Sequence, residues 1–360
     1  MSRLFKYMVL AGLPFLGGGC QSIEQFSIDY RVPAEVSFPS SFRRVGIVNN
    51  IPEQGVDSAQ VMRSADGGQV LLSQGKGALA AEALAQTLAE ANHFEEVIIC
   101  DSALRVRDSV PRTEGLSVEE VLSLTQELGA DFLVSMENIH ILTRRKVTHF
   151  PDMGIYQGTV DALVSPMVRI YTPGRKAAMA TLHPVDSIYW ESVSPTLGAA
   201  MERLLPDSEV QNQASDFAGE MVVKLLLPYW KSAPRSYYIG SGVAMRDAAV
   251  CIHEGDWDKA VELWQQSYRS RKAKTRMQAA YNIALGYEMQ DSIQTALEWA
   301  RKAQELAKQV EKVDEKRQNE MKLDTQAISN FIRVSAYVTE LEQRARLLPL
   351  LQMQTQGTSE

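Results

Sequence analysis

The chain has 360 residues, of which 45% are hydrophobic and 22% charged, and both values are ordinary for a folded protein. Its formal net charge is −7 at pH 7 and its pI is about 5.5, which argues against nucleic-acid binding because that needs a basic surface. Length alone favours two or three domains. The last residues are polar, and we expect a disordered tail at 351–360.

The first twenty residues have the layout of a secretory signal. Arg3 and Lys6 form a basic start, an apolar run covers 8–16, and three glycines precede Cys20. The apolar run is shorter than the roughly 20 residues that a helix needs to cross a bilayer. We therefore predict a signal peptide over residues 1–19 that is removed during export.

The cysteine directly after these small residues resembles the lipobox of bacterial lipoproteins. The usual leucine three positions before the cysteine is replaced by Gly17, and Leu16 lies one position earlier. The resemblance implies lipid attachment at Cys20, which tethers a protein stably when several acyl chains insert together. Residues 21–24 hold no acidic cluster of the kind that directs some lipoproteins to the cell surface, so we expect an outer-membrane protein facing the periplasm. Gly17 and Gly19 also fit an ordinary cleavage site, which leaves a soluble periplasmic protein as the alternative.

A lead-in at 20–42 is followed by strand and helix patterns that define a predicted α/β domain at 43–232. Ser117 and Glu120 form a capping box, Gly129 ends that helix, and Ser208 is the expected cap of the last helix. The order of elements suits a mixed sheet covered by helices. We expect strands at 43–49, 97–100 and 131–142, helices at 78–91, 117–128 and 208–227, and a hairpin made of 160–171 and 178–190.

This pattern resembles the small α/β domain of the curli-secretion lipoprotein and of the lipoprotein activators of penicillin-binding proteins. The resemblance rests on the strand near Val45, the helix near Ala81, the strand start from Phe94 to Val97 and the step from Gly129 to Val134. Such proteins mostly bind other proteins, so the resemblance implies a binding role.

The back half, 236–350, contains an internal repeat. Gly255–Ala260 recurs about 36 positions later as Asp291–Ala296, close to the period of tetratricopeptide repeats. We therefore predict an all-α, tetratricopeptide-like domain. Its expected helices are 243–254, 257–267, 274–289, 293–308 and a long capping helix at 314–343.

Most of the chain also resembles a family of gut-bacterial lipoproteins of unknown function. The resemblance implies envelope location and the same order of domains, and it implies no activity. The motifs that carry it are Tyr30–Pro39, Val45–Asn50, Leu227–Gly242, Gly255–Trp264 and Ala279–Gln290.

No pattern for a metal or cofactor stands out, since the five histidines form no HExxH motif and the three cysteines form no CxxC. Cys100 and Cys251 fall in different predicted domains, which argues against a disulfide. Aromatic residues gather at the predicted domain junction, and because aromatics concentrate in interface hot spots they are candidate partner-binding residues. Packing between the domains is the favoured interpretation of this cluster, and partner binding is the second. These residues are Tyr229, Trp230, Tyr237 and Tyr238.

The sequence favours a non-catalytic, membrane-anchored envelope protein that binds a protein partner, with the repeat groove taking a peptide or helix. One alternative is a hydrolase of envelope polymers that uses His183, Asp186 and Glu191. Another is an oligomeric secretion-accessory lipoprotein, which would need two long hairpins where the sequence shows one.

Overall fold

The computed structural model describes residues 23–52, 60–63, 69–100, 104–105, 108, 114–240, 242–319 and 324–356. The predicted signal peptide and Cys20 lie outside these residues. The chain divides into an α/β unit, Arg31–Trp230 with Leu348–Glu360, and a helical unit, Met1–Tyr30 with Lys231–Leu347. The predicted fold class, a mixed-sheet α/β region followed by an all-α region, is confirmed. Over the described ranges, no helix combines the length and apolar character that a bilayer span requires.

The α/β unit is built on a mixed sheet, eight-stranded in its described part. Its centre is β2 (Arg44–Asn49), which pairs in parallel with β5 (Glu96–Ile99) and β6 (Phe132–Phe150). Val45, Ile47 and Val48 in β2 are fully buried, as expected of a parallel strand that is covered on both faces. The remaining strands are antiparallel to their neighbours: β3 (Gln60–Arg63), β4 (Gln69–Gln74), β7 (Ile155–Tyr171), β8 (Ala180–Leu182) and β9 (Asp186–Ser194).

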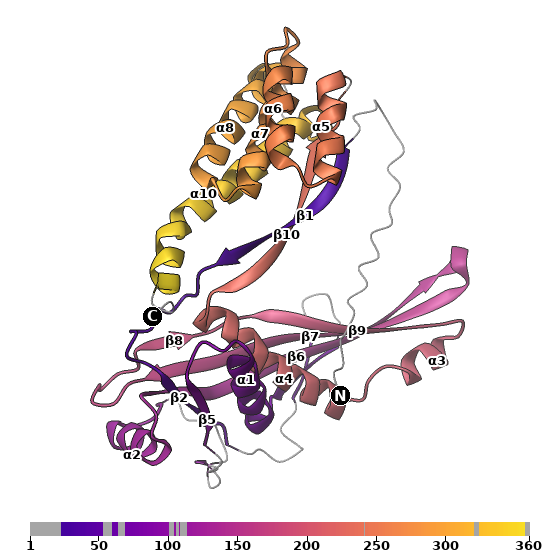
Figure 1. Ribbon diagram of the computed structural model, residues 1–360. Helices are drawn as coiled ribbons and strands as arrows, with labels where there is room; N and C mark the ends of the chain where they lie inside the picture. Colours follow the sequence, from indigo (N-terminus) through magenta and orange to yellow (C-terminus); the bar gives the residue numbers. More distant parts are fainter. Residues whose placement is uncertain are drawn as a thin grey trace. The chain divides into compact units, whose positions relative to one another are not determined.

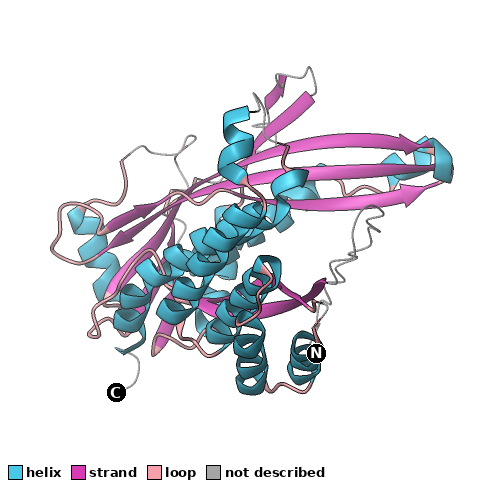
Figure 2. Ribbon diagram, turned by 90° about the horizontal axis from the view of Figure 1, so that it is seen from above, coloured by secondary structure: helices cyan, strands magenta, loops and turns pink. Residues whose placement is uncertain are grey.

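Strands β6, β7 and β9 run side by side as a long antiparallel extension (Figure 2). Strand β6 continues eight residues beyond Leu142, where the predicted strand ended. The polar run Arg144–Lys146 hid this continuation, because its side chains are exposed although the backbone still pairs with β7. The predicted hairpin turn has Gly174 at φ +79°, but the second arm is interrupted between β8 and β9. Pro184 lies in that gap and has no N–H to donate to the ladder.

Helices cover the sheet on both faces. Figure 1 shows α1 (Gly77–Glu90) and α4 (Asp207–Leu226) packed together against it, and they share its larger core. Helix α2 (Val118–Leu128) covers a smaller core on the other face, and it has the predicted capping box and the predicted left-handed Gly129. Helix α4 begins one residue before Ser208, so the predicted cap is wrong. Pro206 takes the cap position without a side-chain hydrogen bond, and its φ of −64° already suits a helix start. A short helix, α3 (Leu197–Glu202), precedes it.

The helical unit contains the four repeat helices within two residues of their predicted bounds. They are α5 (Val243–His253), α6 (Trp257–Tyr268), α7 (Ala273–Met289) and α8 (Ile293–Val310). Trp264, Ile283 and Ala300 are fully buried between them, which explains the apolar spacing of the repeat.

The predicted long helix at 314–343 is two helices. Helix α9 (Val313–Asn319) is followed by a 3₁₀ turn (Gln326–Ile328) and by α10 (Ser329–Gln356). The carboxylate of Glu311 accepts the backbone N–H groups of Asn330 and Phe331, which fixes the start of α10. Because α10 runs to Gln356, the prediction of disorder is wrong for residues 351–356.

The predicted lead-in contains a strand. Strand β1 (Ile23–Val32) pairs with β10 (Tyr229–Tyr238) in a two-stranded sheet, and we call this pair the ribbon. Most of the ribbon belongs to the helical unit, so the predicted boundaries at 43–232 and 236–350 differ from the observed division. Cys100 and Cys251 lie in different units, as expected.

Candidate binding pocket

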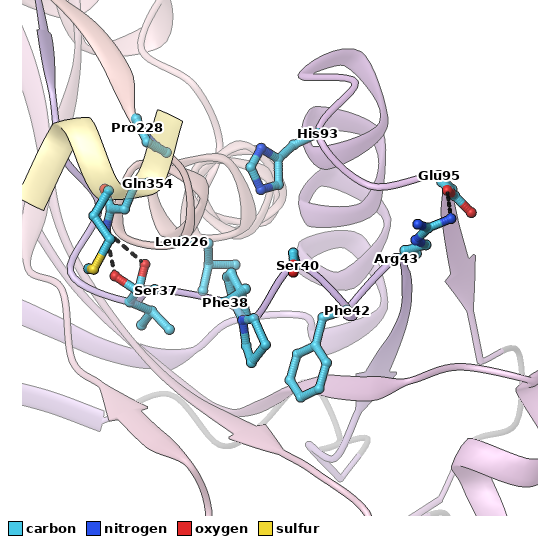
Figure 3. A pocket seen from close by; sticks show the side chains of 13 residues that line it. Ser37, Phe38, Ser40, Phe42, Arg43, His93, Glu95, Leu226, Pro228 and Gln354 are labelled. Atoms are coloured by element: carbon cyan, nitrogen blue, oxygen red, sulfur yellow. Dashed lines mark hydrogen bonds and ion pairs between the residues drawn. The ribbon is translucent and has the colours of Figure 1, made fainter. Parts of the chain in front are cut away.

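An open pocket of about 360 Å³ lies in the α/β unit (Figure 3). Its walls come from the segment after β1, the turn between α1 and β5, the end of α4 and the last turn of α10. The lining residues are Val36, Ser37, Phe38, Pro39, Ser40, Phe42, Arg43, His93, Glu95, Leu226, Pro228, Met353 and Gln354. Its volume falls in the range typical of small-ligand sites, roughly 300–1,000 Å³.

Phenylalanine rings form the apolar base of the pocket. Phe38 packs against Phe94 at 5.5 Å and against Phe132 at 4.9 Å between ring centres, and Phe42 stacks on Phe132 at 5.0 Å. Phe132 and Phe94 are buried, whereas Phe38 and Phe42 are half-buried and reach the pocket. Aromatic clusters of this kind combine a large apolar area with fixed geometry, so the base is rigid.

The segment after β1 is held in place at two points. The backbone N–H groups of Glu35 and Val36 donate to the carbonyl oxygen of Leu225, at 2.9 and 3.2 Å. On the other side, the Gln354 side chain accepts from the N–H of Ala34 at 2.9 Å and donates to the Ala34 carbonyl at 3.1 Å and to Ser37 Oγ at 3.0 Å. The last turn of α10 is thus a fixed wall of the pocket.

The rim of the pocket carries polar groups. In Figure 3 the His93 ring points from the end of α1 toward the middle of the pocket. Burial, and then the positive charge of Arg31, lowers the pKa of His93, so the ring is neutral at pH 7. Arg43 and Glu95 form an exposed ion pair at 2.9 Å, and such pairs contribute little stability.

Ser37 and Ser40 supply hydroxyl groups to the pocket. A nucleophile needs a base within hydrogen-bond reach, and over the described ranges neither Ser37 nor Ser40 has a hydrogen bond with His93. In the same ranges no three His, Cys, Asp or Glu side chains come together as metal ligands. What the pocket offers is an apolar base, hydroxyl groups and a neutral imidazole.

The predicted aromatic residues all lie on β10, but they do not form one surface. Tyr237 and Tyr238 are only 2% and 1% exposed and belong to the core of the helical unit. Trp230 is 68% exposed, with the guanidinium of Arg31 6.0 Å from its ring, and Tyr229 is half-buried. Tyr237 and Tyr238 therefore take part in packing within the helical unit, whereas partner binding by Trp230 and Tyr229 stays a prediction.

The repeat helices already hold a strand of the same chain. Asn282 on α7 bonds the backbone of Tyr238 twice, accepting its N–H at 2.9 Å and donating to its carbonyl at 2.7 Å. Arg235 in β10 pairs with Glu288 of α7 at 2.8 Å and with Glu340 of α10 at 2.7 Å. The ribbon thus covers faces of α7 and α10.

The residues of the hydrolase alternative do not converge. His183 lies in the gap between β8 and β9, and its side chain is exposed. Asp186 and Glu191 are five residues apart in β9, so they point to opposite faces of the sheet. Glu191 accepts a hydrogen bond from Gln157 at 2.8 Å.

The pocket was not predicted from the sequence. Three of its walls belong to segments that were expected to be a lead-in, a turn and a disordered tail. The signal that was present is the pair Phe38 and Phe42, which bracket Pro39 in the predicted lead-in. Large apolar residues beside a proline in a supposed linker indicate a segment packed onto a core.

The fold therefore joins an α/β domain with an open pocket to a helical-hairpin unit. Residues 42–238 match a family model described as "Domain of unknown function (DUF8603)", and this is more than half of the chain. The chain belongs to that family. Residues 246–343 match a second model, "Domain of unknown function (DUF6340)". No curated protein matches the chain.

Proposed function

We propose that the protein is a membrane-anchored envelope lipoprotein that binds a protein partner and catalyses no reaction. The observation that carries this proposal is the pocket at His93, which would take an apolar side chain of the partner. Binding hot spots are typically apolar anchors in such pockets, ringed by polar groups that exclude water. Phe38 and Phe42 supply the base here, and Ser37, Ser40 and His93 supply the ring.

The membrane anchor in this proposal is a lipid on Cys20. The motivating feature is the order of a basic start, a short apolar run, glycines and a cysteine. Strand β1 begins at Ile23, three residues after Cys20, and an extended chain of that length spans roughly 11 Å. The protein would then sit close to the membrane, facing the periplasm. A soluble periplasmic protein is the alternative if Cys20 is not lipidated.

A photo-crosslinking amino acid at Ser40 in living cells tests the binding site. Leu122, exposed on α2 of the same unit, is the control position. We expect one protein to crosslink from position 40 and not from position 122. Ser37→Trp should fill the pocket and abolish this crosslink, whereas Ser187→Trp on the exposed face of β9 should leave it intact. Equal crosslinking from both positions, or insensitivity to Ser37→Trp, would reject the pocket as the docking site.

A second candidate, the oligomeric secretion-accessory lipoprotein, is favoured by the free edge of β9. Among the described strands β9 pairs only with β7, and Tyr189 and Val193 on it are 67% and 48% exposed. Exposed apolar edge strands are templates for pairing with another chain. Light scattering of the detergent-solubilised protein measures its mass. A multimer that Tyr189→Lys dissociates supports this candidate, and a monomer rejects it.

A further inference from the structure

A second pocket, of about 240 Å³, lies in the helical unit where the ribbon meets α7 and α10. It is distinct from the pocket at His93, which belongs to the α/β unit. Three arginines and two glutamates lie at this pocket or next to it. Which of these side chains form ion pairs with one another therefore determines the charge that the pocket presents to a ligand. Its lining residues are Gln25, Pro234, Arg235, Ser236, Tyr281, Arg333, Ala336, Tyr337 and Glu340.

Both glutamates are fully engaged. Glu288 is buried and accepts hydrogen bonds from Arg235 at 2.8 Å, from Tyr337 at 2.8 Å and from Arg344. Glu340 accepts from Arg235 at 2.7 Å and from the Tyr30 hydroxyl at 3.1 Å. Two carboxylates thus neutralise Arg235 and Arg344, which are themselves almost completely buried.

Arg333 is the third arginine, and neither of these glutamates forms an ion pair with it. Its side chain is half-buried on α10, its Nη1 donates to the Tyr238 hydroxyl at 3.1 Å, and its guanidinium lies 5.6 Å from the centre of that ring. In the described part of the chain no carboxylate forms an ion pair with it. Glu311 also acts on Tyr238 through its charge, but its oxygens accept the N–H groups at the start of α10, and within the described residues it forms no ion pair with Arg333. A partly desolvated cation without a direct ion-pair partner is unfavourable, and a bound anion would reduce that cost.

Hydroxyl and amide side chains line the pocket together with this arginine. Ser236, Tyr281 and Gln25 all line the pocket. Burial raises the pKa of Tyr281 to about 12, an effect reduced by a hydrogen bond with Ser236 and by the charge of Arg333, so its hydroxyl keeps its proton at neutral pH. Neutral donors beside a guanidinium suit an oxyanion and disfavour a cation.

We propose that this pocket, centred on Arg333, binds an oxyanion group, a carboxylate or a phosphate, of a small ligand. The planar guanidinium offers parallel N–H groups that match two oxygens of such an anion, and only its Nη1 is engaged by Tyr238. The site lies in a different unit from the pocket at His93 and does not depend on the proposed protein-binding function.

The test uses the mature chain in detergent and three probes with the same aromatic body: benzoate, phenyl phosphate and the uncharged benzamide. Isothermal titration calorimetry gives the dissociation constants. We expect at least one anion to bind and benzamide not to bind. Arg333→Gln should weaken anion binding about tenfold or more. Arg301→Gln is the matched control, because Arg301 is exposed and already paired with Glu342 at 2.8 Å.

Tighter binding of benzoate or of phenyl phosphate identifies the preferred oxyanion, and either preference supports the site. Arg333→Lys keeps the charge but loses the planar donors, so it should weaken binding less than the glutamine variant and remains decisive if that variant unfolds. Absence of anion binding to the unmodified chain would overturn the proposal. So would equal binding of benzamide, or unchanged affinity in both Arg333 variants.

Discussion

Gln354 joins two segments that lie 320 positions apart in the sequence. It holds the backbone of Ala34 through both its amide oxygen and its amide nitrogen, and so closes one wall of the pocket at His93. Asn282 does the same for Tyr238 in the helical unit. Neither role could be predicted from the sequence, because a glutamine in a polar tail and an asparagine in a repeat helix have no local pattern that marks their distant partners.

Replacing Gln354 with alanine should destabilise the α/β unit. The change leaves the N–H of Ala34 and its carbonyl without this partner, and the expected loss is about 1–3 kcal/mol. Gln352→Ala is the control, since Gln352 lies on the same helix and is exposed. Urea denaturation followed by circular dichroism measures the free energy of unfolding. Equal losses for the two variants would contradict the assigned role.

Removing the carboxylate of Glu288 should be more damaging. Glu288→Ala leaves Arg235 and Arg344 partly unpaired in a buried site, and breaking such a network typically costs about 3–5 kcal/mol. Glu298→Ala, at an exposed position on α8, is the control. Melting temperatures should separate the two variants by many degrees. A small effect at Glu288 would mean that the network does not hold the ribbon.

His93 should make the α/β unit sensitive to acid. Its pKa in the folded chain is below the ordinary value of 6.5, so below pH 6.5 the unfolded chain takes up a proton that the folded chain resists. This contribution to stability is therefore present above pH 6.5 and is lost as the pH falls through the interval down to the folded pKa. His93→Gln should flatten that part of the stability curve, and His183→Gln should not. Parallel curves for His93→Gln and the unmodified chain would exclude this cause.

At the scale of elements, the sequence predicts best where the signal is local. The capping box of α2 and the four repeat helices follow from residues three and four apart, and all of them are confirmed. The ribbon and the far half of β6 were missed, because a strand is stabilised by partners distant in sequence. The split between α9 and α10 was missed for a similar reason, since Glu311 fixes it from outside the helix.

Helices α1 and α4 pack so closely at Gly219 that a larger side chain there should destabilise the α/β unit. A methyl group at Gly219 of α4 would lie 2.2 Å from the carbonyl oxygen of Ala80 on α1, so Gly219→Ala must push the helices apart. We expect a loss of about 1–3 kcal/mol. Gly198 on α3 has nothing within 4 Å of such a group, so Gly198→Ala should be neutral or stabilising. Thermal unfolding of both variants checks the contrast, and a neutral Gly219→Ala would show that α1 and α4 are less tightly packed.

For the whole molecule, the sequence predicted the order of the two units and their fold class, because composition and periodicity differ clearly between the two halves. The two compact units do not coincide with the predicted domains, since β1, β10 and α10 each contribute residues to both units. The pocket at His93 was not predicted from the sequence, because its walls also come from segments that are distant in sequence. The pocket at His93 combines segments from near both ends of the chain, and only the folded structure brings Phe38, His93 and Gln354 together.

The central claim is that this chain works as a lipid-tethered binding protein, and the mass of its mature N-terminus tests that claim most directly. Intact-mass and peptide mass spectrometry of protein extracted from membranes should show a chain that starts at Cys20 and carries acyl groups on that residue. Cys20→Ser should abolish both the added mass and the membrane association. A mature chain with an unmodified Cys20, or one that keeps residues 1–19, would contradict the account.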